Sequence, residues 1–382
     1  RWMDGWMDRS AVLDFTSALY LGMRHASEAL RPWGQLSMGR PAALASPPNA
    51  DAVAEQLAAL LGSERATLVP STLHLFWDLF AILASERIAI YMDAGTYAIV
   101  RWGVERAAAR GTPVRIFQHH DPDALHDHLK RDARRGMQPV VVADGLCPAC
   151  GASAPITAYL ENVRTYDGYL VLDDTQALGI LGRRQEPDAP YGMGGGGSLR
   201  WNRVSSPDVI VGSSLAKGFG VPVAVLAGSE MMVKRFEQAS ETRTHCSPSS
   251  NAVIHAAEHA LAMNGEHGDD IRFRLWNLVG QLRRGLTEAG LSLHGGRFPV
   301  QTLALSPGLD HAELHEDLLR RGVRTVLHHA RDGFRAQISF LITALHRFQD
   351  IDKTTEAVKQ VAQLQGATLV PPEGTYEKPI QL

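Results

Sequence analysis

The sequence has little cysteine, no long apolar run and no excess of charge of either sign. Three cysteines among 382 residues cannot form a disulfide framework, and an odd number suits a reducing compartment. No stretch approaches the roughly 18 consecutive apolar residues of a membrane-spanning helix. The 38 basic and 41 acidic residues give a net charge of −3, which supplies no electrostatic footprint for nucleic acid or an acidic membrane. We therefore expect a cytoplasmic protein whose partners are small molecules and protein.

The N-terminal residues show no targeting signal, because residues 1–10 mix charges with tryptophan and methionine and lead into no apolar core. Since the chain begins at Arg1 rather than at a methionine, we expect an upstream segment to have been removed. Hydrophobic residues make up 45% and charged residues 21%, close to globular averages. At about 150 residues per domain, the length predicts two or three domains.

From about residue 51, short apolar runs alternate with helical periodicity, a pattern typical of α/β proteins with a largely parallel sheet. This predicts an N-terminal segment over 1–50 and a large domain over 51–262 with a mainly parallel, seven-stranded sheet. A smaller C-terminal α/β domain is expected over 263–366, with helices over 269–289 and from about 350, followed by a tail over 367–382. The predicted strands are Ala66–Val69, Ile88–Met92, Val114–Phe117, Val140–Ala143, Tyr169–Leu172, Val209–Val211 and Val223–Ala227.

The pattern breaks between residues 183 and 206, where two prolines and the run Gly194–Gly197 occur. This composition predicts a long, mobile surface loop or lid. A phosphate-binding loop is the weaker interpretation, because no strand leads into the glycines and no clear helix follows them.

Two side chains that could take part in catalysis follow two of the predicted strands. Asp173 ends the apolar run over 169–172, and Lys217 comes shortly after the run that begins at Val209. The carboxyl ends of parallel strands open on one side of a sheet, where ligands of doubly wound folds usually bind. The pattern therefore predicts that an acid and a lysine meet at one ligand site.

The same segments resemble a known family. "LVLDDTQALGILG" (170–182) is similar to the aspartate motif of the α-oxoamine synthases, and "SSLAKGFG" (213–220) to their lysine motif. "DGLCPACGASAP" (144–155) and "FRAQISFLITALH" (334–346) follow in the family's order. The resemblance covers nearly the whole chain. It implies a fold-type-I enzyme dependent on pyridoxal phosphate (PLP), a group that includes the aminotransferases and whose members are usually homodimers.

For this family the resemblance implies that Lys217 and Asp173 are the catalytic residues. A lysine amine forms a Schiff base (an aldimine) with the PLP aldehyde, and an aspartate keeps the pyridine nitrogen protonated. The ring can then accept electrons from a substrate carbanion, which gives a quinonoid intermediate. Burial in a cofactor site favours the neutral amine that attacks the aldehyde.

Further cofactor contacts are implied by the same resemblance. Ser71, Thr72 and Leu73 precede a helical stretch at the place of the family's phosphate loop, and Ser214 matches the family's hydroxyl residue. A plain helix N-cap is the alternative for Ser71 and Thr72. Tyr97 takes the place of a histidine that stacks on the ring, and the alternative for Tyr97 is an aromatic of the core on a helix face.

Two arginines are candidates for substrate binding. Arg335 occupies the place of the arginine that holds a substrate carboxylate through two parallel hydrogen bonds, so the resemblance implies an α-amino acid substrate. A surface arginine at a strand edge is the alternative. Arg40 aligns with an N-terminal segment that faces the active site in the family.

Three positions depart from the family pattern. Gln176 replaces a histidine near the cofactor and cannot act as an acid or base near neutral pH. Pro148 replaces a serine and lacks both a hydroxyl and a backbone N–H, and Tyr97 replaces the stacking histidine. These departures argue against the family's usual condensation of an amino acid with an acyl-CoA.

Three functions remain open from the sequence. The first is a PLP-dependent transferase that joins an α-amino acid to an unidentified acceptor, including elimination and replacement on an activated amino acid such as S-adenosylmethionine. The alternative is an aminotransferase between an amino acid and a 2-oxo acid, which Tyr97 favours. The third is a protein that keeps the fold as a scaffold without catalysis.

The sequence predicts no metal site. Cys147 and Cys150 form a C-x-x-C pair, which elsewhere indicates redox or metal chemistry. Zinc needs about four ligands, and the further candidates, His245 and Cys246, lie nearly a hundred residues away in sequence.

Overall fold

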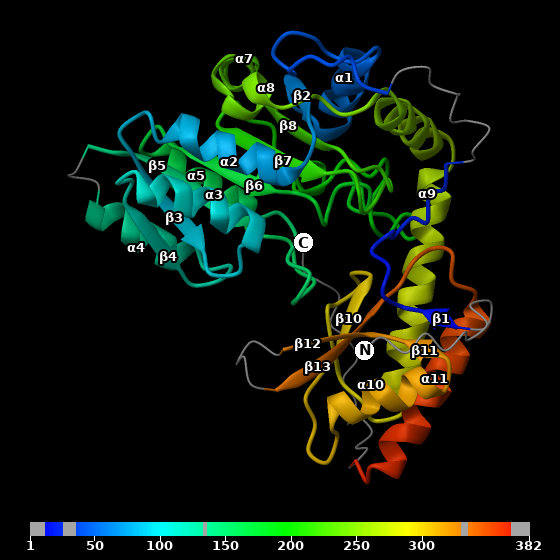
Figure 1. Cartoon of the computed structure of the whole chain (residues 1–382). Helices are drawn as coiled ribbons and strands as arrows, with labels where there is room; N and C mark the ends of the chain where they lie inside the picture. The colour runs from blue at the N-terminus through cyan, green and yellow to red at the C-terminus, as the bar shows by residue number, and fades with distance from the viewer. Residues whose placement is uncertain (1–11, 26–35, 133–135, 330–334, 368–382) are drawn as a thin grey trace, which may run out of the picture. The chain divides into compact units, whose positions relative to one another are not determined.

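The computed structural model describes residues 12–25, 36–132, 136–329 and 335–367 (Figure 1). They divide into two compact units. The larger unit comprises residues 21–147 and 153–273, and the smaller one 12–20, 148–152 and 274–367, as far as these are described. Helix α9 (Asn251–Glu288) runs unbroken through residue 262, where the sequence predicts a domain boundary.

The larger unit contains the seven-stranded sheet that the sequence predicts. The strand order is β2-β8-β7-β6-β5-β3-β4, and β8 runs antiparallel to both its neighbours while the others are parallel. The predicted α/β fold with a mainly parallel sheet is therefore confirmed. The strands are β2 (Arg65–Val69), β3 (Ile88–Asp93), β4 (Val114–Phe117), β5 (Gln138–Asp144), β6 (Tyr169–Asp173), β7 (Val209–Ser214) and β8 (Ala224–Gly228).

Helices cover both faces of this sheet. Consecutive side chains of a strand point to opposite faces, and Val140, Val141 and Val142 are all fully buried. The helices are α1 (Ala50–Leu61), α2 (Thr72–Leu83), α3 (Ala98–Ala109), α4 (Pro122–Asp132), α5 (Ile156–Arg164), α6 (Ser198–Trp201), α7 (Glu230–Ala239), α8 (Glu241–His245) and the first part of α9.

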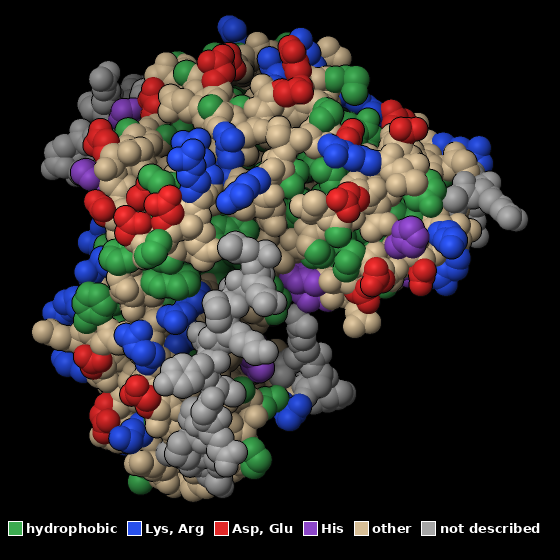
Figure 2. All heavy atoms as spheres, turned by 180° about the vertical axis from the view of Figure 1, so that it is seen from behind, with side chains coloured by type: hydrophobic (Ala, Val, Ile, Leu, Met, Phe, Trp, Pro, Cys, Tyr) green, Lys and Arg blue, Asp and Glu red, His purple; other side chains and the backbone are tan. Residues whose placement is uncertain are grey.

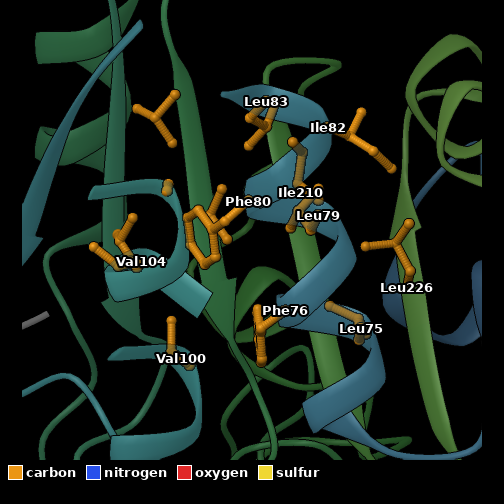
Figure 3. Close-up of a cluster of buried hydrophobic side chains, with 14 of the residues drawn as sticks. Leu75, Phe76, Leu79, Phe80, Ile82, Leu83, Val100, Val104, Ile210 and Leu226 are labelled. Carbon is orange, nitrogen blue, oxygen red and sulfur yellow. The ribbon is translucent and has the colours of Figure 1, made fainter. Parts of the chain in front are cut away.

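Helix α2 is the centre of one layer of the core. Its side chains Phe76 and Phe80 are fully buried, and Figure 3 shows them among Val100 and Val104 of α3 and Ile210 of β7. Helix α3 approaches closely because of Gly103, where a Cβ atom would lie 2.6 Å from the carbonyl oxygen of Phe76. The cluster fixes α2 against the sheet, and α2 begins at the predicted phosphate-binding segment.

The smaller unit carries a four-stranded antiparallel sheet in the order β12-β13-β10-β9 and a parallel pair, β1 with β11. Helices α10 and α11 and the last part of α9 belong to it, and α11 begins two residues before the predicted position. The elements are β1 (Leu13–Asp14), β9 (Leu293–His294), β10 (Val300–Leu303), α10 (His311–Arg320), β11 (Val323–Arg324), β12 (Val326–His329), β13 (Ala336–Leu341) and α11 (Phe348–Leu364). The predicted tail, 367–382, lies almost entirely outside the described residues.

The glycine run is not the mobile surface lid that the sequence predicts. Residues 195–197 are buried, and Gly194 donates its N–H to Asp269 (2.8 Å) and accepts from the Asn264 amide (2.9 Å). A Cβ at residue 195 would lie 2.6 Å from the Arg272 guanidinium, so glycine permits this close approach. The exposed residues of the 183–206 segment are 183–188, 193, 203 and 205, and a short helix, α6, does follow the glycines.

None of the helices in the described part of the chain is long and apolar enough to cross a membrane. Figure 2 shows Lys and Arg side chains interspersed with Asp and Glu side chains over one face, in keeping with the small net charge.

Candidate active site

Acidic side chains end two neighbouring parallel strands of the larger sheet. Asp144 is the last residue of β5 and Asp173 the last of β6, and the two are Cα partners across the strand pair. Asp173 is in turn paired with Gly212 of β7, two residues before Ser214. The strand register therefore places these polar groups side by side at one edge of the sheet.

Lys217 lies in the turn that follows β7. The turn is fixed by backbone hydrogen bonds from Leu215 N to Val223 O (2.9 Å) and from Phe219 N to Leu215 O (3.2 Å). Gly218 is required there, because a Cβ atom would lie 2.6 Å from the carbonyl oxygen of Leu178.

The electrostatics of Lys217 favour a reactive amine. Burial lowers the pKa of the Lys217 amine, while the carboxyls of Asp173 and Asp144 act in the opposite direction. A lowered pKa increases the neutral fraction at a given pH, and the neutral amine is the nucleophile. This chemistry is what a covalent attachment to an aldehyde requires.

Asp173 is held in place by its own strand end. The backbone N–H of Thr175 donates to Asp173 Oδ1 (3.0 Å), and Thr175 Oγ1 accepts from the backbone N–H of Ser214 (3.0 Å). Burial raises the pKa of the Asp173 carboxyl above its usual value, and hydrogen bonds from Thr175 and the Lys217 charge offset only part of this rise. Thr175 thus connects the aspartate to the end of β7, an arrangement that the sequence did not reveal.

The predicted phosphate-binding segment forms the start of α2. Ser71 is the N-cap, and its hydroxyl accepts from the backbone N–H of His74 (3.5 Å) and lies 2.8 Å from the His74 ring nitrogen. The first N–H groups of a helix have no partner within the helix and attract anions. Capping by Ser71, predicted as an alternative, is therefore present together with a helix start that suits an anion.

Tyr97 stands at the N-cap of α3 and is 51% exposed, so it is not a core aromatic on a helix face. The Lys217 Nζ atom lies 5.6 Å from the centroid of the Tyr97 ring. The backbone N–H of Tyr97 donates to Asp144 Oδ1 (3.1 Å). The ring is thus placed beside the lysine, where a flat ligand can stack on it.

A cavity of about 210 Å³ brings most of these predicted residues together. Its predicted lining residues are Thr72, Tyr97, Asp173, Gln176, Ser214 and Lys217, and its further lining residues are Ile99, Asp144, Thr175 and Ala216. Ser71 and Leu73 are not among the residues that line it. A larger cavity, of about 620 Å³, lies against α1, β2 and α7 and includes none of the predicted site residues.

The predicted substrate arginines are not part of this lining. Arg40 is exposed in the larger unit. Arg335 is exposed immediately before β13 in the smaller unit. Their contact with a substrate carboxylate remains a prediction.

Sequence reasoning missed the role of Asp174, the second residue of the Asp-Asp pair. Its fully buried carboxylate accepts the backbone N–H of Ser198 (2.9 Å), the first residue of α6. Burial raises the pKa of Asp174 to about 6. Asp174 thereby connects the end of β6 to the residue that follows the glycine run (194–197).

The cysteine pair has unequal surroundings. Cys147 is buried, Cys150 is exposed, and neither forms a disulfide.

Comparisons with known proteins bear on the family and the fold. No family model matches the chain. The chain is 28% identical to the 8-amino-7-oxononanoate synthase of Alcanivorax borkumensis over 310 residues, which cover 80% of this chain and 76% of the relative. It is 26% identical to the 8-amino-7-oxononanoate synthase of Sodalis glossinidius over 364 residues, which cover 93% of this chain and 89% of the relative. A solved structure of SPT with a PLP internal aldimine has a TM-score of 0.81 at 17% identity, covering 93% of this chain and 88% of that chain.

The likeness to the solved structure concerns the fold. The chain has the fold of this PLP-containing structure, in agreement with the predicted fold-type-I architecture. Within that class, the predicted resemblance to the α-oxoamine synthases is confirmed, because the curated relatives are 8-amino-7-oxononanoate synthases and are aligned over most of the chain.

Proposed function

We propose that this protein is a PLP-dependent transferase that condenses an α-amino acid with an acyl-CoA. The predicted class, a PLP-dependent transferase, is confirmed by the relatives, which are synthases of the α-oxoamine type. The observation that carries the proposal is the meeting of Lys217, Asp173 and Tyr97 at one cavity.

The cavity suits PLP in its donor set. A partly buried amine of lowered pKa, a buried carboxylate and an aromatic ring match an aldehyde, a pyridine nitrogen and a flat ring. The start of α2 and the Ser214 hydroxyl suit a phosphate. When bound, PLP supplies an electron-withdrawing ring that makes the substrate Cα acidic.

The chain's own residues then have distinct tasks. Lys217 would hold the cofactor covalently, and its free amine would be a base in the same cavity. Asp173 would stabilise the positive charge of the ring nitrogen. Tyr97 would orient the ring by stacking. Gln176 lines the cavity and can only donate or accept hydrogen bonds there.

The relatives favour an acyl-CoA acceptor despite the three departures from the family pattern. They give no support to elimination and replacement on S-adenosylmethionine, and that chemistry is not part of the proposal. A homodimer and a cytoplasmic location belong to the proposal as well, on the strength of the resemblance.

An aminotransferase is the second candidate, because Tyr97 stands in the cavity where an aromatic ring is common in that group. The two functions differ in what happens to the amino group. A condensation releases free CoA thiol from an acyl-CoA, whereas a transamination converts the cofactor to its pyridoxamine form.

The experiment is incubation of the PLP-loaded protein with a panel of amino acids, each with and without a panel of acyl-CoA thioesters. We expect thiol release that depends on one amino acid and is lost in Lys217→Ala but kept in Lys234→Ala, a surface lysine of α7. Conversion to the pyridoxamine form that a 2-oxo acid reverses, without thiol release, would establish the aminotransferase. Failure to take up PLP would leave only the scaffold hypothesis.

A further inference from the structure

Asp144 is a carboxyl of the cavity to which the proposed function gives no task. It lines the cavity together with Asp173 and Lys217, and only 7% of its surface is exposed. A buried acid costs free energy unless it is paired or keeps its proton. Its presence at the centre of a ligand site therefore needs an explanation.

The charges at this edge of the sheet do not balance if both acids ionise. Asp144 and Asp173 are neighbours in register, and both are buried. Lys217 is the single cationic residue among those that line the cavity. Without cofactor, this one cation can compensate one carboxylate; in the PLP-loaded site the ring nitrogen would pair with Asp173, which still leaves Asp144 without a cation of its own. Two like charges in a shared buried site raise each other's proton affinity. One of the two carboxyls therefore keeps a proton.

Hydrogen bonds determine which of the two carboxyls, Asp144 or Asp173, keeps the proton. Asp173 accepts from the Thr175 backbone N–H at 3.0 Å, and both the Thr175 side chain and the Lys217 charge stabilise its anion further. Asp144 accepts one hydrogen bond, from the Tyr97 backbone N–H at 3.1 Å. The anion is thus better stabilised on Asp173, and the proton belongs on Asp144.

The other titratable groups around Asp144 act in the same direction. Burial raises the pKa of Asp144 well above its usual value, and the carboxylate of Asp173 raises it further. Cys147, in the loop that follows β5, and Asp93, at the end of β3, add smaller contributions of the same sign. Tyr97 contributes a backbone N–H that lowers this pKa. The cation facing the site, Lys217, is shared with Asp173.

We propose that Asp144 is a neutral carboxylic acid within the cofactor cavity, which leaves Asp173 as the single carboxylate there. This inference rests on the proposed function, because it concerns the state of the PLP-loaded site. A neutral acid adds no second negative charge beside Asp173 and Lys217. Asp144 is thus a positioning residue that acts through the ionisation of Asp173 and Lys217.

The test is infrared difference spectroscopy on PLP-loaded protein at pH 7, which reads the carbonyl stretch of protonated carboxyls without any turnover. We compare wild type with Asp144→Asn, an isostere of the neutral acid. Asp93→Asn is the matched control, since Asp93 is also a buried carboxyl at a strand end but does not line the cavity. Buried Asp174 contributes equally to all three proteins and cancels in the differences.

We expect a protonated-carboxyl band that disappears in Asp144→Asn and persists in Asp93→Asn. The proposal is overturned if wild type minus Asp144→Asn shows no such band. Asp144→Glu is a second variant, in case Asp144→Asn does not fold: it keeps a carboxyl at the same place, so the band shifts in frequency if Asp144 holds the proton and is unchanged if Asp173 holds it.

The visible absorption of bound PLP, recorded on the same samples, distinguishes a failure of this inference from a failure of the proposed function. Bound PLP without the Asp144 band overturns only this inference. No bound PLP in the wild type overturns the proposed function and this inference with it.

Discussion

Replacement of Asp173 by Asn changes one charge in the cavity and little else. Asn has the same size, and its side-chain oxygen can still accept the Thr175 N–H that lies 3.0 Å from Asp173 Oδ1. The negative charge opposite the cofactor's ring nitrogen is lost. The carboxylate is buried, so solvent does not replace the lost interaction.

The size of the effect follows from the kind of bond that is lost. A hydrogen bond to a charged group contributes about 1.5–3 kcal/mol, which corresponds to PLP binding that is roughly 10- to 150-fold weaker. Asp173 also raises the pKa of Lys217, so the variant should have a still lower lysine pKa.

The assay is equilibrium titration of apoprotein with PLP, followed by protein fluorescence, for wild type and Asp173→Asn. Asp208→Asn serves as the control, because Asp208 forms a surface ion pair with Arg164. A loss of affinity below about threefold, or roughly 0.6 kcal/mol, would refute the placement of Asp173 against the ring nitrogen.

Three further predictions concern stability, measured by urea unfolding. Phe80→Ala removes a fully buried ring from the α2 cluster and should lower the unfolding free energy by about 3–5 kcal/mol; a loss below about 1 kcal/mol would contradict the packing. Gly195→Ala should destabilise by about 1–2 kcal/mol more than Gly194→Ala, because both have positive φ but only the former meets Arg272; equal losses would contradict the close approach. Burial opposes ionisation of Asp269, but Arg272 and the Gly194 N–H prevail and lower its pKa below the unfolded value. The ion pair therefore stabilises the fold fully above the pKa of Asp269 in the unfolded chain, and this stabilisation is lost as the pH falls through its pKa in the folded protein. Asp269→Asn should cost about 1 kcal/mol at pH 7, allowing for partial exposure, and less below about pH 4. A cost independent of pH would contradict the pairing.

The large sheet could be predicted from the sequence because its central strands are short apolar runs with both faces buried. Val140–Ala143 and Tyr169–Leu172 are such runs, and β5 and β6 extend them by only one to three residues. The strand order and the antiparallel direction of β8 depend on long-range pairing, which leaves no local pattern.

The first half of α9 could not be predicted. Residues 251–268 include Gly265 and Gly268, and each glycine costs a helix about 1 kcal/mol relative to alanine. The structure explains Gly268: a Cβ atom there would lie 2.5 Å from Asn264 Oδ1 and 2.8 Å from an Arg272 nitrogen. Tertiary contacts with the glycine run (194–197) outweigh the low helix propensity of these glycines.

The structure places several residues that the sequence predicts separately around one cavity, but the sequence predicts only part of the cavity lining. Asp173 and Lys217 could be found because each follows a strand and matches a family motif. Asp144 follows a predicted strand in the same way, which is the signal that could have marked it. Thr175 joins the site through a hydrogen bond between strand ends, and no spacing rule reveals such a contact.

The central claim is that Lys217 holds PLP covalently. Its most direct test is borohydride reduction of the PLP-loaded protein, followed by digestion and mass spectrometry of the peptides. We predict that the mass of reduced PLP is found on the peptide containing Lys217 in wild type and in Lys234→Ala, and on no peptide in Lys217→Ala. Labelling of another lysine, or of none in the wild type, would contradict the claim.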